Sequence, residues 1–194
     1  MNNFWGAVSE MLLDLAVVLP PSRDRAGREH MARLAGRLGY TAVHVHPGQL
    51  EEGETETLVI AAEPAMVVID SGEDVSGIVR SNDPMEVRRV RAVLNDVEDL
   101  RPLIVAVPIS IGRTLNEAVA RADRDPRFVD DDHPEVSGIF GTFEQAQDQV
   151  LELARAGAEI LLLTVPDELD IADVLAQIKA LVVGATPALL NRQP

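Results

Sequence analysis

The chain has no cysteine, few aromatic residues and few basic residues. The absence of cysteine excludes disulfides, thiolate metal ligands and cysteine nucleophiles, and it favours a reducing compartment, so we expect a cytoplasmic protein. One Trp, one Tyr and four Phe are too few to form a large platform on which bases or sugars stack. The net charge of −15 repels phosphate backbones and anionic lipid, so nucleic acid is not an expected partner.

Long apolar runs and paired glycines are also missing. The N-terminal run from Met11 to Leu19 contains Asp14, follows Glu10 and is shorter than the roughly 20 residues that span a bilayer, so we expect no membrane partner. The chain has neither a Gly-x-Gly nor a Gly-Gly element. The usual glycine-rich loop that holds a phosphate on backbone amides therefore has no counterpart in this sequence.

The residues that are present indicate one α/β domain over residues 1–194. The chain has 194 residues, 46% of them hydrophobic, which is enough to bury a full core. One unit of helix, glycine, strand and proline appears twice, closing first on Gly39 and Pro47 and later on Gly157 and Pro166. Such a repeat is typical of a barrel or of a doubly wound sheet.

Apolar runs and helix-start signals alternate along the chain and predict about six strands and five helices. The predicted strands cover residues 12–20, 41–47, 57–62, 65–70, 103–111 and 160–165. The predicted helices begin after the N-cap residues Ser22, Asp83, Thr114, Thr142 and Asp170. Because a complete (βα)8 barrel takes about 250 residues, the sequence predicts an incomplete parallel (βα) barrel of the TIM type. Residues 48–56 and 124–137 are expected to be loops.

Two segments together resemble the luciferase-like family of flavin- or F420-dependent oxidoreductases. The first is Leu13 to Pro47, with a strand, a Pro-rich turn and a helix that closes on Leu38-Gly39-Tyr40. The second runs from Leu103 through Ile111-Gly-Arg-Thr114 and Gly138-Ile-Phe-Gly-Thr142 to Ala156-Gly157-Ala158-Glu159 and the leucines after it. The resemblance covers roughly the first quarter and the last half of the chain. Residues 48–100 are too few for the family's middle block, so the resemblance implies a shortened member.

The resemblance implies a (βα) barrel that binds FMN or coenzyme F420 and, if active, transfers a hydride or activates oxygen as a monooxygenase. The family often places polar residues near the end of its second strand, which makes His46, and next His44, the candidate catalytic residues. Both alternate with valines and point to one face of their strand. The alternative is a pair of partly exposed rim histidines. A His-x-His metal site lacks a third ligand, so no metal site is predicted.

Four further residues are candidates for cofactor binding. Gly141 and Thr142 begin a helix whose positive end suits a phosphate, although Thr142 with Gln145 is also an ordinary capping box. Ser110 and Glu63 end apolar runs, where polar residues meet the site of a parallel sheet. Asp70 pairs with Glu63 as a possible acid and base. The cluster from Asp130 to His133 lacks the alternating ligands of a calcium loop and favours a solvated acidic loop.

A second function, from a different class, stays open beside the oxidoreductase. Few aromatics, no phosphate loop and an incomplete barrel with an open edge suit a non-catalytic relative, which acts as a partner subunit or a small-molecule binding protein. An open edge favours a homodimer or association with a related subunit.

Overall fold

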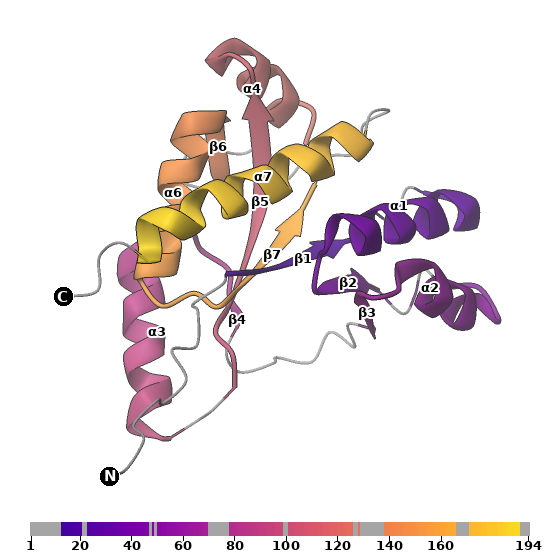
Figure 1. The fold of residues 1–194 in the computed structure, drawn as a ribbon, viewed down its shortest axis with the longest axis horizontal. Coiled ribbons are helices and arrows are strands. Elements are labelled where there is room, and N and C mark those ends of the chain that lie inside the picture. The colour runs from indigo at the N-terminus through magenta and orange to yellow at the C-terminus, as the bar shows by residue number, and fades with distance from the viewer. Residues whose placement is uncertain are drawn as a thin grey trace, which may run out of the picture.

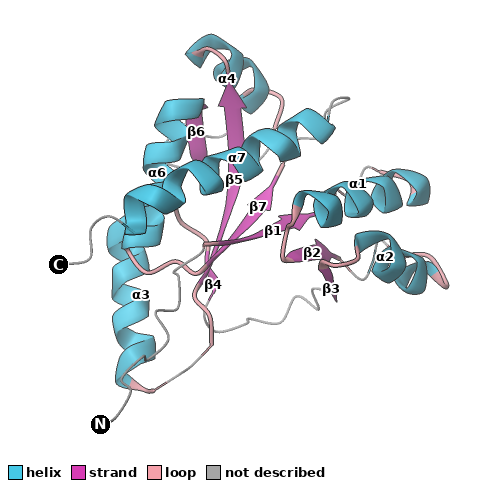
Figure 2. Cartoon of the chain, in the orientation of Figure 1, coloured by secondary structure: helices cyan, strands magenta, loops and turns pink. Residues whose placement is uncertain are grey.

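The computed structural model describes residues 13–20, 23–46, 48, 50–69, 78–98, 101–125, 128, 138–165 and 171–190 of the chain. In this part, seven strands and six helices alternate for most of the length (Figures 1 and 2). The strands are β1 (Asp14–Val18), β2 (Ala42–Val45), β3 (Met66–Ile69), β4 (Ile78–Val79), β5 (Ile104–Gly112), β6 (Ile139–Thr142) and β7 (Ile160–Thr164). The helices are α1 (Arg25–Leu38), α2 (Glu54–Ala62), α3 (Pro84–Asp96), α4 (Leu115–Ala122), α6 (Phe143–Arg155) and α7 (Ile171–Leu190).

All seven strands join one parallel sheet, in the order β3-β2-β1-β7-β5-β4, with β6 also paired to β5. The first strand is central, since Val18 lies opposite both His44 of β2 and Thr164 of β7. Within the described residues no ladder joins β3 to β4, so the sheet has two edges there. The predicted α/β class with a parallel sheet is confirmed, and the described residues do not close a barrel.

The long strand β5 changes partners at Pro108. Residues 104–108 pair with β7, and residues 109–112 pair with β6. The short strand β4 lies beside the start of β5, opposite residues 104 and 105. Proline has no N–H to donate to a ladder. It therefore stands where pairing with β4 has ended and pairing with β6 has not begun.

One face of the sheet carries the main core. Five helices pack against this face: α1, α2, α3, α6 and α7 each contribute buried side chains to its apolar cluster. Val43 and Val45 of β2 lie fully buried there, and Tyr40 donates its hydroxyl to the Leu175 carbonyl of α7 at 3.0 Å. Burial raises the pKa of Tyr40 well above its usual range. Val43 and Val45 thus pack beneath the helices, and His44 between them faces the other side of the sheet.

Helix α4 lies on the other side of the sheet, which we call the second face. Ser110 points there, opposite to Ile109 and Ile111 of the main core, and its Oγ donates to the Ala118 carbonyl of α4 at 2.8 Å. A Cβ on Gly112 would come within 2.4 Å of the Ala118 nitrogen, so glycine is required where α4 crosses. Four connections, which contain α1, α2, α3 and α6, each lead to a strand nearer β3 in the sheet order. The connection from β5 to β6, which contains α4, leads in the opposite direction. A right-handed crossover therefore puts its helix on the opposite face.

Helix ends follow the sequence signals closely, with one change at α1. Asp83 caps α3, accepting from the Met85 N–H at 2.8 Å, and Pro84 occupies the first turn. Gly39 ends α1 in the left-handed conformation, with φ of 76°. The N-cap of α1 is Asp24, which accepts from the Gly27 N–H at 2.8 Å, rather than the predicted Ser22. Ser22 and the predicted cap Asp170 lie outside the described residues.

The predicted strand over residues 57–62 is wrong, because this segment belongs to α2. Leu58 and Ala62, four residues apart, face the core, while Val59 and Ile60 are exposed. A six-residue apolar run has the same composition in a buried strand as in a short helix. The loop predicted over residues 48–56 is accordingly shorter, since α2 begins at Glu54. Strands β4 and β6 were not predicted from the sequence.

Candidate functional site

The carboxyl ends of parallel strands meet at one edge of the sheet, which is where α/β proteins bind their ligands. His44 lies at this end of β2, half-buried, on the second face. Its neighbours across the ladder are Val18 of β1 and Val68 of β3. Val18 in turn lies opposite Thr164 of β7. His44, Val18 and Thr164 thus form one row, and His46 follows just beyond the strand as an exposed residue.

The second face around this row is apolar. Ala16, Ala42 and Leu162 form its buried cluster, and half-buried strand residues pack against them, namely Val18, Val68, Ile104, Ala106 and Ile160. Among the described residues, no helix contributes a side chain to this cluster. His44 is therefore a titratable group at the rim of a small apolar wall made by strands alone.

Ser110, Gly141 and Thr142 come together at the ends of β5 and β6, where residues 109–112 lie beside residues 139–142. This group is separate from His44, because β1 and β7 lie between β2 and β5. Three interstrand spacings of about 4.8 Å amount to roughly 14 Å. The sequence candidates thus form two groups rather than one site.

The polar atoms of this second group already have partners. Ser110 is 1% exposed, and its hydroxyl holds α4 to the sheet. Thr142 and Gln145 form the predicted reciprocal capping box of α6: the Gln145 N–H donates to Thr142 Oγ1 at 3.4 Å, and the Thr142 N–H donates to Gln145 Oε1 at 2.9 Å. Gly141 has φ of 130°, and a Cβ there would lie 2.6 Å from Gln145 Oε1. A phosphate at this helix start would have to displace the Gln145 side chain.

Glu63 lies at the amino ends of the strands, whereas His44 lies at their carboxyl ends. Glu63 follows α2 and precedes β3, so it is an exposed residue at the amino end of a strand. The sequence prediction places Glu63 at a strand's carboxyl end because it treats residues 57–62 as a strand. The suggested partner of Glu63, Asp70, and the acidic cluster 130–133 lie outside the described part of the chain.

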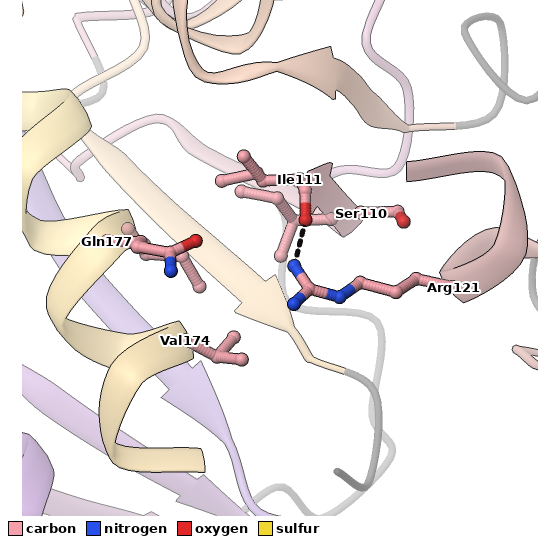
Figure 3. A pocket seen from close by; sticks show the side chains of 7 residues that line it. Ser110, Ile111, Arg121, Val174 and Gln177 are labelled. Atoms are coloured by element: carbon pink, nitrogen blue, oxygen red, sulfur yellow. Dashed lines mark hydrogen bonds between the residues drawn. The ribbon is translucent and has the colours of Figure 1, made fainter. Parts of the chain in front are cut away.

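A narrow pocket, which the sequence did not indicate, lies where β5 and β7 separate (Figure 3). It is lined by residues of β5, α4 and α7: Ile109, Ser110, Ile111, Arg121, Val174, Gln177 and Ile178. The helix after β5 lies on the second face and the helix after β7 on the main-core face. Adjacent strands whose helices diverge in this way create the crevice in which doubly wound sheets bind ligands.

Arg121 is the charged residue of this pocket. Its guanidinium points from α4 to the end of β5, where it donates to the Ile111 carbonyl (Figure 3). Its Nη2 lies 3.5 Å from Glu117 Oε1, and the side chain is 20% exposed. A hydrogen bond from the Arg113 backbone N–H lowers the pKa of Glu117, and a hydrogen bond from the Arg113 side chain lowers it further. The pocket holds little more than a water molecule, so it suits a small polar group and not a flavin ring.

A buried ion pair joins the segments that follow the carboxyl ends of β1 and β2. Arg28, in the first turn of α1, donates through Nε to Glu54 Oε1 at 2.6 Å and through Nη2 to Glu54 Oε2 at 2.7 Å. The Glu51 N–H also donates to Glu54 Oε2, at 2.9 Å. These hydrogen bonds hold the pKa of Glu54 below its usual range. The pair joins the segments that follow β1 and β2, and nothing in the local sequence patterns indicates it.

Two other kinds of feature are absent from the described residues. No three His, Asp or Glu side chains converge there as metal ligands would. No helix among them combines the length and the apolar character that crossing a bilayer requires.

Comparison with known proteins identifies no family. No family model matches the chain, and no curated protein matches it. Among solved structures, the chain is similar to the crystal structure of apo-MsnO8, with 20% sequence identity and a TM-score of 0.25. The match covers 90% of this chain and 51% of the MsnO8 chain, so this chain spans about half of that protein. A score at this level does not establish a shared fold.

Proposed function

We propose that this chain is a shortened luciferase-like protein that binds FMN or coenzyme F420 at the carboxyl ends of its strands. The observation that carries the proposal is the row of His44, Val18 and Thr164 beside an apolar cluster of the second face to which no described helix contributes a side chain. In a barrel such a face is the lumen. The pairing of β1 with both the second and the last strand is also the pairing of a barrel. The proposal therefore includes descent from an incomplete (βα) barrel.

The described residues fit the ring of such a cofactor better than its phosphate. The half-buried apolar side chains Val18, Val68 and Ala106, which pack on the buried Ala16, Ala42 and Leu162, would provide the apolar contact for an aromatic ring. At the phosphate end, Ser110 and Thr142 are engaged in hydrogen bonds to the helices that follow them, α4 and α6. When bound, the cofactor supplies hydride transfer or oxygen activation. The role of His44 is to hold or release a proton beside the ring, because histidine side chains exchange protons near neutral pH.

The test is a titration with FMN and, separately, with F420, followed by ligand fluorescence and by melting temperature. A ligand that binds only the native state must raise the melting temperature. We expect saturable binding with a dissociation constant below about 100 μM, which corresponds to roughly 5.5 kcal/mol. His44→Ala should weaken binding, whereas His30→Ala, on the exposed face of α1, should not. If neither FMN nor F420 bound saturably, the proposal would be contradicted.

A second candidate function is a non-catalytic relative that acts as a partner subunit or binds another small molecule. The narrowness of the pocket beside Arg121 favours it, as do the engaged polar atoms of Ser110 and Thr142. This candidate predicts no thermal shift with FMN or F420, together with association of the protein in solution. The titration with FMN and F420 on the same preparation separates the two candidates.

A further inference from the structure

Four large apolar side chains are exposed on the outermost strand and helix at one edge of the sheet. Met66 and Ile69 of β3 are 62% and 44% exposed, and Val59 and Ile60 of α2 are 52% and 75% exposed. We call these four residues the β3 edge patch. The helix cannot bury Val59 and Ile60 in its own chain, because Leu58 and Ala62 occupy its inner side and Thr57 meets Arg25 of α1. Met66 lies on the second face of the sheet, whereas Ile69 and α2 lie on the main-core face, so the exposed apolar side chains flank the edge of β3 on both faces. Large apolar side chains exposed at one edge in this way suit an interaction surface.

The backbone of β3 has one paired side and one outer side. The Met66 N–H donates to the Thr41 carbonyl at 3.0 Å, and residues 66–69 run beside residues 42–45 of β2. In a parallel ladder, alternate residues direct their N–H and C=O groups to the same neighbour. Val67 and Ile69 therefore direct theirs away from β2, toward the side on which the described residues contain no further strand.

This edge strand is short, with four residues, but it lacks the charges and the proline that usually prevent strands from pairing between molecules. The strand sequence Met-Val-Val-Ile has no charge and no proline, whereas natural edge strands are commonly short, charged or interrupted. The other outermost strands are β4, with two residues, and β6, with four, and both pair only with β5 in the described structure. A partner for β3 must therefore be an uncharged strand whose neighbouring helix also presents apolar side chains.

We propose that β3 pairs with β3 of a second copy of this chain, antiparallel, about a two-fold axis that passes beside Val68. A two-fold interface uses the same patch twice, and it gives the antiparallel arrangement without any change in either copy. In this register Val67 bonds to Ile69 of the second copy and Ile69 to its Val67, so all outward groups of both residues are paired. The exposed side chains of α2 then approach those of the second α2. The dimer needs no cofactor and no reaction, so it does not depend on the proposed binding of FMN or F420.

The charge of the chain sets the salt dependence of this dimer. Glu56 on α2 and Glu63 at its end are exposed beside the patch, and each copy has a net charge of −15. Like charges oppose association, and salt screens them, with a Debye length of only about 10 Å at 0.1 M and less above it. We expect dimerisation to strengthen as salt is raised, because the contact itself is apolar.

The first test compares matched variants by sedimentation equilibrium. Met66→Lys and Ile60→Lys each place a charge in the contact, and both residues are exposed, so the fold should persist. Met85→Lys is the matched control, since Met85 on α3 is 65% exposed and lies outside the patch. We expect wild type and Met85→Lys to dimerise and the two patch variants to be at least tenfold weaker. A monomeric wild type would overturn the proposal, and so would a dimer that all three variants retain.

The second test fixes the register. Across the axis, Val68 faces Val68 of the second copy as a non-hydrogen-bonded pair, with Cα atoms about 4.5 Å apart, a separation at which a disulfide forms. Because the chain has no cysteine, any disulfide-linked dimer must come from an introduced one. Val68→Cys should cross-link under mild oxidation much faster than Met85→Cys. Equal rates for the two variants would overturn the proposed pairing.

Discussion

Arg28 and Glu54 are joined by two short hydrogen bonds, of 2.6 and 2.7 Å, although 26 residues separate them in the chain. Both side chains are buried, at 6% and 0% exposure. Arg28 also donates to the Arg23 carbonyl ahead of α1, and Glu54 accepts from the Glu51 N–H ahead of α2. The pair thus ties the starts of two helices to each other and to the loops that leave β1 and β2.

Removal of either partner should destabilise the protein strongly. Arg28→Ala leaves the Glu54 carboxylate buried without its counter-charge, and we expect a loss of about 3–5 kcal/mol in the free energy of unfolding. Urea denaturation at pH 7 measures it. Arg113→Ala is the control: its pair with Glu117 is 3.3 Å long but Arg113 is 89% exposed, so the loss should stay below about 1 kcal/mol. Equal losses in both variants would show that burial does not decide the strength of these pairs.

The same pair makes stability depend on pH. The folded-state pKa of Glu54 is lowered, whereas an unfolded glutamate titrates near pH 4.3. The stabilisation by ionised Glu54 is therefore complete above about pH 4.3 and is lost as the pH falls through the lower folded-state value. We expect the stability difference between wild type and Glu54→Gln to shrink on acidification over this window. A difference that stays constant from pH 7 to about pH 3 would contradict this assignment.

Gly36 should not tolerate a side chain, because α1 and α2 touch there. A Cβ at Gly36 would lie 2.1 Å from the Ala62 carbonyl oxygen, a backbone atom that cannot turn aside. Gly36→Ala should cost about 1–3 kcal/mol or more in the free energy of unfolding, through forced separation of the helices. The control is Gly27→Ala in the same helix, where the nearest atom is a side-chain oxygen at 3.0 Å. There we expect a change below about 1 kcal/mol, since alanine also favours helix.

Thr142 should contribute to stability through the capping box of α6. Thr142→Ala removes the oxygen that accepts from the Gln145 N–H, and we expect a loss of about 1 kcal/mol. Thr142→Ser keeps the oxygen and should retain most of the stability. Thermal denaturation of the three proteins measures both effects. If serine and alanine were equally destabilising, the threonine methyl group, and not the cap, would be the cause.

The sequence predicted the helix ends that are set by capping residues close in the chain. Gly39 has φ of 76° at the end of α1, Asp83 and Pro84 begin α3, and Thr142 with Gln145 begins α6. Each of these signals acts within a few residues, so a single sequence contains it. The alternation of His44 with Val43 and Val45 was likewise predictable, because it follows from the two-residue period of a strand.

Features that depend on distant residues were not predictable. Residues 57–62 form a helix because Glu54 is held by Arg28 and because Leu58 and Ala62 meet α1, and neither contact is visible in the local pattern. The two-residue strand β4 is too short to carry a period. The crevice at Arg121 depends on β7 lying beside β5, a strand order that spacing along the chain does not determine. Because residues 57–62 were predicted as a strand, Glu63 was predicted at a strand's carboxyl end, although it lies at the amino end of β3.

The change of partners at Pro108 divides the sheet into parts that can open separately. In the described structure β6 pairs with no strand other than β5, through residues 109–112, and these residues share no ladder with β4 or β7. Helix α4 rests on that same segment. Loss of this corner breaks none of the pairs among β1, β2, β3 and β7. The corner is therefore a unit of local unfolding, whose amide hydrogens should exchange with solvent before those of the central ladder.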